Sequence, residues 1–159
     1  MHGPVAAMHV IAAGVALLSG LLVVLWRKGK ALHRLTGLIY VFAMLMTNIS
    51  ALMIYRLTGH FGVFHVFALL SLFYTLVGLV MPILRRRNWL NAHVQWMSWS
   101  YLSLLGAAMN ELLIRLPLHF DTPPRIIGVG IGLAAILTTI GIGLRPHLRR
   151  VAQSYSSAA

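Results

Sequence analysis

The sequence predicts an all-α protein that crosses a membrane several times, and three observations support this fold class. The chain has 159 residues and is 59% hydrophobic. Charged residues make up only 9% of it, whereas soluble domains typically contain about 25%. Several apolar runs approach or exceed the roughly 20 residues that a helix needs to cross a bilayer. We therefore expect a polytopic membrane protein.

Five apolar runs are predicted to be transmembrane helices, and the first four belong together. The first covers residues 4–26, and Pro4 suits its first turn because the missing N–H has no helical partner there. The next three cover residues 32–55, 61–84 and 91–114. Short connections make sequential helices antiparallel neighbours. Residues 1–115 are thus predicted to form an antiparallel four-helix transmembrane bundle.

The rest of the chain is predicted to form three further parts. An outer loop covers residues 116–125 and contains Pro117, Pro123 and Pro124. A fifth transmembrane helix covers residues 126–144, and residues 145–159 form a basic and then polar cytoplasmic tail.

Small residues in the fifth predicted helix indicate close packing. Gly128 and Gly132 are four residues apart, and small residues at this spacing let helix backbones approach each other in lipid. The helix would pack either on its own bundle or against a membrane-protein partner, including a second copy of the chain.

The formal net charge of +11 is best explained by membrane topology. Lysine and arginine gather at the predicted helix ends, in residues 27–34, 85–87 and 145–150, which all lie on one side of the membrane. Because such residues mark cytoplasmic loops, we expect the N-terminus outside and the C-terminus in the cytoplasm of a bacterial inner membrane. Contact with the lipid bilayer accounts for the charge, so nucleic acid is not an expected partner. The chain has no cysteine, which excludes disulfide and thiolate chemistry.

Four of the eight histidines lie near the starts of the four bundle helices: His9, His33, His65 and His93. The predicted topology places His9 and His65 at a similar outer depth and His33 and His93 at a similar inner depth. Each pair comes from parallel helices, which are diagonal in a four-helix bundle.

The helical period predicts that these histidines face the bundle interior. Steps of three and four residues from His33 reach Tyr40 and Asn48, the most polar stripe of that helix. The same steps from His93 reach Glu111, which lies five turns further on. An ionisable residue that faces the interior of a membrane bundle suggests a functional site. The competing interpretation places Glu111 at the hydrated outer interface.

Three interpretations of the histidine pairs stay open. Two imidazoles on diagonal helices can be axial ligands of b-type haem, so that His9 with His65, and His33 with His93, would carry electrons across the membrane. Arg34 and the basic loops would suit the haem propionates. Alternatively, His9, His65 and Glu111, with Asn48 nearby, resemble a zinc or non-haem iron site. In the third interpretation the histidines are structural and the chain, without a cofactor, is an accessory subunit of a larger membrane complex.

Part of the second predicted helix carries a family resemblance. Leu32, His33, Arg34, Gly37 and Tyr40 form the pattern LHRxxGxxY, and the sequence NAHVQWM contains a histidine and a methionine four residues apart. Together with a histidine in the first helix, these motifs are similar to those of bacterial membrane proteins of domain of unknown function 2306. The resemblance covers about residues 8–110 and brings no established activity. The topology is also similar in outline to that of transmembrane b-type cytochromes.

Overall fold

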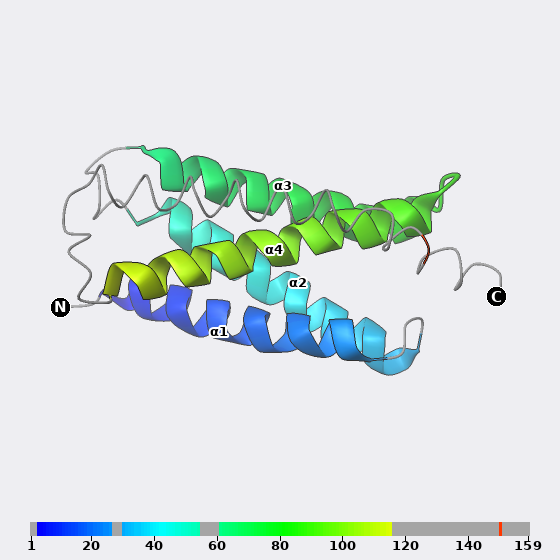
Figure 1. Cartoon of the computed structure of the whole chain (residues 1–159), viewed down its shortest axis with the longest axis horizontal. Helices are drawn as coiled ribbons and strands as arrows, with labels where there is room; N and C mark the ends of the chain where they lie inside the picture. The colour runs from blue at the N-terminus through cyan, green and yellow to red at the C-terminus, as the bar shows by residue number, and fades with distance from the viewer. Residues whose placement is uncertain (1–2, 27–29, 55–60, 116–149, 151–159) are drawn as a thin grey trace. The chain divides into compact units, whose positions relative to one another are not determined.

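The computed structural model of the chain describes residues 3–26, 30–54, 61–115 and 150. Within these residues the regular structure is α-helical, which confirms the predicted class. Figure 1 shows the four helices, α1 (Pro4–Leu25), α2 (Ala31–Leu52), α3 (Val63–Leu84) and α4 (Trp89–Arg115). The chain divides within α3 into two compact units, Met1–Leu72 and Phe73–Ala159. The predicted fifth helix, with Gly128 and Gly132, lies outside the described residues.

In the first unit, α1 and α2 are antiparallel neighbours (Figure 1). The buried residues of α1 are small, namely Ala16, Ser19 and Gly20. Small side chains allow two helix backbones to approach closely in lipid. From α2, Tyr40 and Met44 are fully buried, so the bulk of this interior comes from α2. Their burial confirms that the stripe predicted from His33 faces inward.

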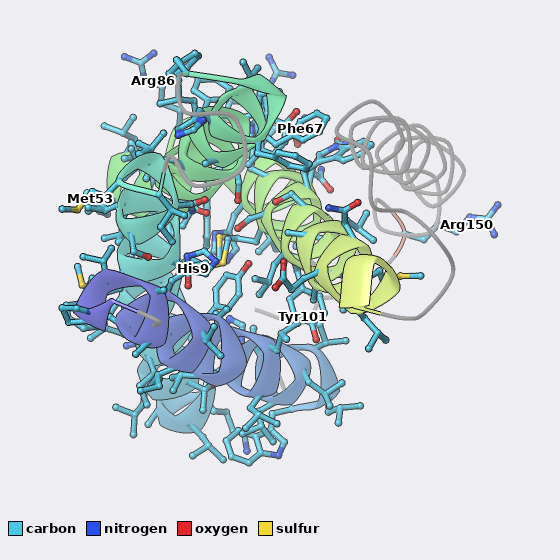
Figure 2. All side chains as sticks on the ribbon, turned by 90° about the vertical axis from the view of Figure 1, so that its left-hand side faces the viewer. His9, Met53, Phe67, Arg86, Tyr101 and Arg150 are labelled. Carbon is cyan, nitrogen blue, oxygen red and sulfur yellow. The ribbon has the colours of Figure 1, made fainter. Side chains whose placement is uncertain are left out.

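In the second unit, α4 is antiparallel to the end of α3 and is joined to it by a tight turn. Arg85 and Asn88 both have positive φ angles, 44° and 68°. Asparagine tolerates this left-handed conformation, whereas arginine adopts it at a cost. The turn closes with a hydrogen bond from the Trp89 N–H to the Arg86 carbonyl at 2.9 Å. Arg86 extends outward from this end of the pair (Figure 2).

The described helices meet the requirements for crossing a membrane to different degrees. Three of them, α1, α2 and residues 64–84 of α3, are long and apolar enough to span a bilayer. The predicted fourth span does form a helix, α4, but it does not reach the same hydropathy. The cause is its polar content, because α4 contains histidine, glutamine, asparagine, serine and tryptophan side chains along its length. Those polar groups mark α4 as the helix in which to look for a functional site.

Candidate functional site

His93 is hydrogen-bonded to the main chain of the neighbouring helix. Its Nδ1 lies 2.7 Å from the carbonyl oxygen of Gly78. Because a carbonyl oxygen only accepts hydrogen bonds, Nδ1 carries the proton and donates it. In the neutral ring the lone pair then lies on Nε2. Histidines that ligate a metal through one nitrogen usually donate the other N–H to a carbonyl or carboxylate, as His93 does here.

Gly78 allows α3 to approach α4 closely. A Cβ atom at position 78 would lie 2.6 Å from Sδ of Met97 and 3.2 Å from its backbone nitrogen. Met97 follows His93 by one helical turn, so the two side chains flank Gly78 on the same face of α4. A larger residue at position 78 would require the Met97 side chain to turn away and the backbone of α4 to shift slightly.

The same contact continues toward the middle of both helices. The hydroxyl groups of Thr75 and Ser100 lie 2.7 Å apart, and both residues are fully buried. We call the set Thr75, Gly78, His93, Met97 and Ser100 the α3–α4 seam. It links the two helices by two short polar contacts, a strong arrangement where water is absent.

His9 makes a corresponding contact in the first unit. Its Nδ1 lies 3.1 Å from the carbonyl oxygen of Thr47 and 3.0 Å from the hydroxyl oxygen of Ser50. Figure 2 shows the side chain between α1 and α2. The carbonyl again requires the proton on Nδ1, which leaves the lone pair on Nε2. His9 and His93 therefore share one tautomer.

His65 has the opposite tautomer. It is 4% exposed, and its Nδ1 accepts a hydrogen bond from the Gly62 N–H at 3.2 Å. In the neutral ring the proton must then be on Nε2. Its ring also packs at 5.1 Å, centroid to centroid, on that of Phe61. In this tautomer Nε2 of His65 carries a proton and has no lone pair with which to ligate a metal.

His33 and Arg34, which the sequence predicts at the inner depth, lie in the first turn of α2. His33 is half-buried, and its Nδ1 atom is buried. Arg34, the next residue, is exposed. A guanidinium group there is accessible to an anionic group beside His33.

Glu111 does not lie on a buried face, although the helical period predicts one. It is exposed, whereas the preceding residue, Asn110, is 8% exposed. The prediction assumed that one face of α4 is covered along its whole length. At Glu111 this face is exposed, although Ser100 and Leu104, which precede it on the same face, are buried. The competing interpretation, in which Glu111 lies at the hydrated outer interface, stays a prediction.

The metal interpretation receives no support from the described residues. Among them, no group of three or more histidine, cysteine, aspartate or glutamate side chains could hold a metal ion. Asn48 is buried, and its Nδ2 donates to the Met44 carbonyl of its own helix at 2.9 Å. The combination of His9, His65, Glu111 and Asn48 stays a prediction from the sequence.

Sequence reasoning found His9 and His93, the two histidines that donate to a neighbouring helix, but missed their partners. Gly78 and Thr47 take part through main-chain carbonyls, which leave no trace in a side-chain pattern. Thr75 and Ser100 were also missed, because a single hydroxyl on an apolar helix is common. One signal was available in the sequence: Pro82 follows Gly78 by four residues.

The helices and the polar contacts between them define an α-helical membrane protein with polar residues in its helix contacts. The chain belongs to the family described as predicted membrane protein DUF2306, whose sequence profile matches residues 6–153. This match confirms the resemblance seen in the LHRxxGxxY motif and extends it over nearly the whole chain. No curated protein and no solved structure matched the chain.

Proposed function

We propose that this protein binds b-type haem in the membrane and transfers electrons through it, with His93 as an axial ligand. The observation that supports this proposal is the hydrogen bond from His93 Nδ1 to the Gly78 carbonyl at 2.7 Å. It directs the lone pair to Nε2, the atom that ligates haem iron, and fixes the ring.

The second axial ligand in this proposal is His33, which the sequence places at the same depth as His93. The pairing of His33 with His93 comes from the predicted topology. Substitution of His33 tests this pairing. His9 has a suitable tautomer, but its predicted partner His65 has the proton on Nε2, since Nδ1 accepts from Gly62. The inner pair is therefore favoured over the outer pair.

Basic residues near both inner histidines favour a group that carries carboxylates. Arg34 follows His33 directly, and the exposed residues Arg85, Arg86 and Arg87 precede α4. Guanidinium groups bind carboxylates with two parallel hydrogen bonds. When bound, haem would supply a one-electron iron couple. The histidines would fix its orientation, and the arginines would hold its propionates at the membrane surface.

The test is the absorption spectrum of the full-length chain, purified in mild detergent from cells supplied with a haem precursor. We expect a Soret band and, after reduction, an α-band. Both should be lost in His93→Ala and in His33→Ala. The matched controls His9→Ala and His65→Ala should keep them, because these residues belong to the outer pair. If those two variants also lose half of the haem, the protein carries two haems.

A colourless wild-type protein without haem in a pyridine haemochrome assay would contradict the proposal. Elemental analysis of that sample separates the remaining interpretations. Stoichiometric zinc or iron that is lost in His9→Ala would favour the metal interpretation.

A second candidate is a structural role in an accessory subunit. The observation in its favour is that two histidines each link two helices, His9 from α1 to α2 and His93 from α4 to α3. In this case His93→Ala lowers thermal stability, the wild type contains neither haem nor metal, and the chain co-purifies with a fixed membrane partner.

A further inference from the structure

Pro82 lies inside α3 and changes the hydrogen bonding of that helix. In an α-helix the carbonyl of each residue accepts from the N–H four residues later. Proline has no N–H, so Pro82 cannot donate to the carbonyl of Gly78. Within a membrane no water replaces the missing donor, and an unsatisfied carbonyl is costly.

The imidazole of His93 donates to this same carbonyl. Its Nδ1 lies 2.7 Å from the Gly78 oxygen, at the short end of the range for N–H···O bonds. The close approach of the helices at Gly78 and Met97 places α4 near enough for this bond. Two independent features of α3 therefore favour the hydrogen bond from His93. Gly78 allows the helices to approach closely, and Pro82 leaves the Gly78 carbonyl without its helical donor.

We infer that Pro82 is a positioning residue for His93: by removing one N–H from α3, it reserves the Gly78 carbonyl for the imidazole and so fixes the tautomer with the lone pair on Nε2. An ordinary residue at position 82 would donate to the same carbonyl. The imidazole would then share its acceptor, and the preference for this tautomer would weaken.

The significance of Pro82 for the cofactor rests on the function proposed above, because a histidine held in this way is a preformed Nε2 ligand. The hydrogen bond and the tautomer do not depend on that function. They can be measured whether or not the protein contains haem.

The experiment is nuclear magnetic resonance of the full-length chain in lipid nanodiscs, with isotope-labelled histidine and under reducing conditions. Comparison with His93→Gln assigns the His93 signals. We expect a strongly downfield Nδ1–H resonance that exchanges slowly with water. In Pro82→Ala it should move upfield, and its exchange should accelerate by about tenfold, the factor for a hydrogen bond weakened by roughly 1.4 kcal/mol.

Two further variants separate positioning from general stability. Pro4→Ala also restores an N–H, but in the first turn of α1, where no helical carbonyl is available to receive it, so the His93 signal should stay unchanged. The α-hydroxy acid analogue of alanine at position 82 has the alanine side chain and no N–H. It should restore the wild-type His93 signal, because only the missing donor matters.

An unchanged His93 signal in Pro82→Ala would overturn the inference, as would a hydroxy-acid variant that resembles Pro82→Ala. The absorption spectra of the same samples keep the two proposals distinct. A colourless wild type with a Pro82-dependent signal contradicts the haem proposal alone. A Soret band together with a signal that does not depend on Pro82 contradicts this inference alone.

Discussion

His9 and His93 each donate to a main-chain carbonyl of a neighbouring helix, and they differ in the carbonyl that each one uses. His9 shares the Thr47 carbonyl, which also lies 3.0 Å from the Ser50 hydroxyl. The structure gives His93 a shorter bond, 2.7 Å, to a carbonyl that has lost its intrahelical donor to Pro82. Both imidazoles carry the proton on Nδ1. The Thr47 carbonyl has the Ser50 hydroxyl beside it, whereas the Gly78 carbonyl lacks the donor of an ordinary helical residue at position 82.

The comparison indicates that the contribution of a helix-to-helix hydrogen bond to stability depends on which other donors the acceptor has. A carbonyl with other donors loses little when the imidazole is removed. A carbonyl with one donor is left unsatisfied, which costs more than an average hydrogen bond is worth. We therefore expect the α3–α4 seam to be the more sensitive of the two contacts, and three predictions test this expectation.

The largest effect is expected for Gly78→Ala, which breaks the seam by overpacking. The new Cβ would meet Met97 at 2.6 Å for Sδ and at 3.2 Å for the backbone nitrogen, so the Met97 side chain must turn away and the α4 backbone must shift slightly. Overpacking of this kind costs about 1–3 kcal/mol. Thermal unfolding in detergent measures it. The matched control is Gly37→Ala, because nothing lies within 4 Å of a Cβ there; equal destabilisation of both variants would contradict the close contact.

The next effect is the difference between His93→Ala and His9→Ala. His93→Ala leaves the Gly78 carbonyl without its donor and should cost about 1–3 kcal/mol. His9→Ala leaves the Thr47 carbonyl with the helical N–H of Ala51 and with the Ser50 hydroxyl 3.0 Å away. It should cost nearer 0.6 kcal/mol, roughly the average for such bonds in membranes. Both free energies come from unfolding of the two purified variants. If His9→Ala is the more destabilising, the comparison fails.

The smallest effect is expected for Ser50→Ala. This substitution makes the His9–Thr47 contact resemble the His93–Gly78 contact, because it removes the hydroxyl group near the Thr47 carbonyl. Without the hydroxyl, the Thr47 carbonyl has His9 as its remaining side-chain donor. We expect a stability change of at most about 0.5 kcal/mol, because Ser50 bonds mainly within its own helix. The informative measurement is the His9 Nδ1–H resonance, which should move downfield toward that of His93. An upfield shift would mean that Ser50, rather than Thr47, is the main acceptor.

Much of the helical structure was predictable because apolar runs are interrupted by charged turns. The predicted first span, residues 4–26, corresponds to α1, and the predicted third span ends with α3 at Leu84. The inward stripe of α2 was also predictable, since Tyr40 and Met44 follow His33 at helical spacing. In these cases one side-chain property, hydrophobicity or polarity, determines the structure.

The candidate site was predictable only in part. His9 and His93 stood out as side chains, whereas their acceptors are main-chain atoms whose availability depends on a neighbouring helix. Glu111 is exposed although it follows His93 at helical spacing, because a helical period does not reveal how far along a helix one face is covered. Pro82 shows that one main-chain acceptor can be located from the sequence, four residues before a proline within a helix.

The turn between α3 and α4 has a consequence for how this pair of helices is retained in the membrane. Arg85 keeps a left-handed backbone that glycine would adopt without strain, and three arginines follow one another there. Moving each through the hydrocarbon would cost roughly 2.5–3.5 kcal/mol. The three arginines therefore oppose passage of this turn through a bilayer, and they hold the adjoining end of α3 on the side of the membrane where it starts.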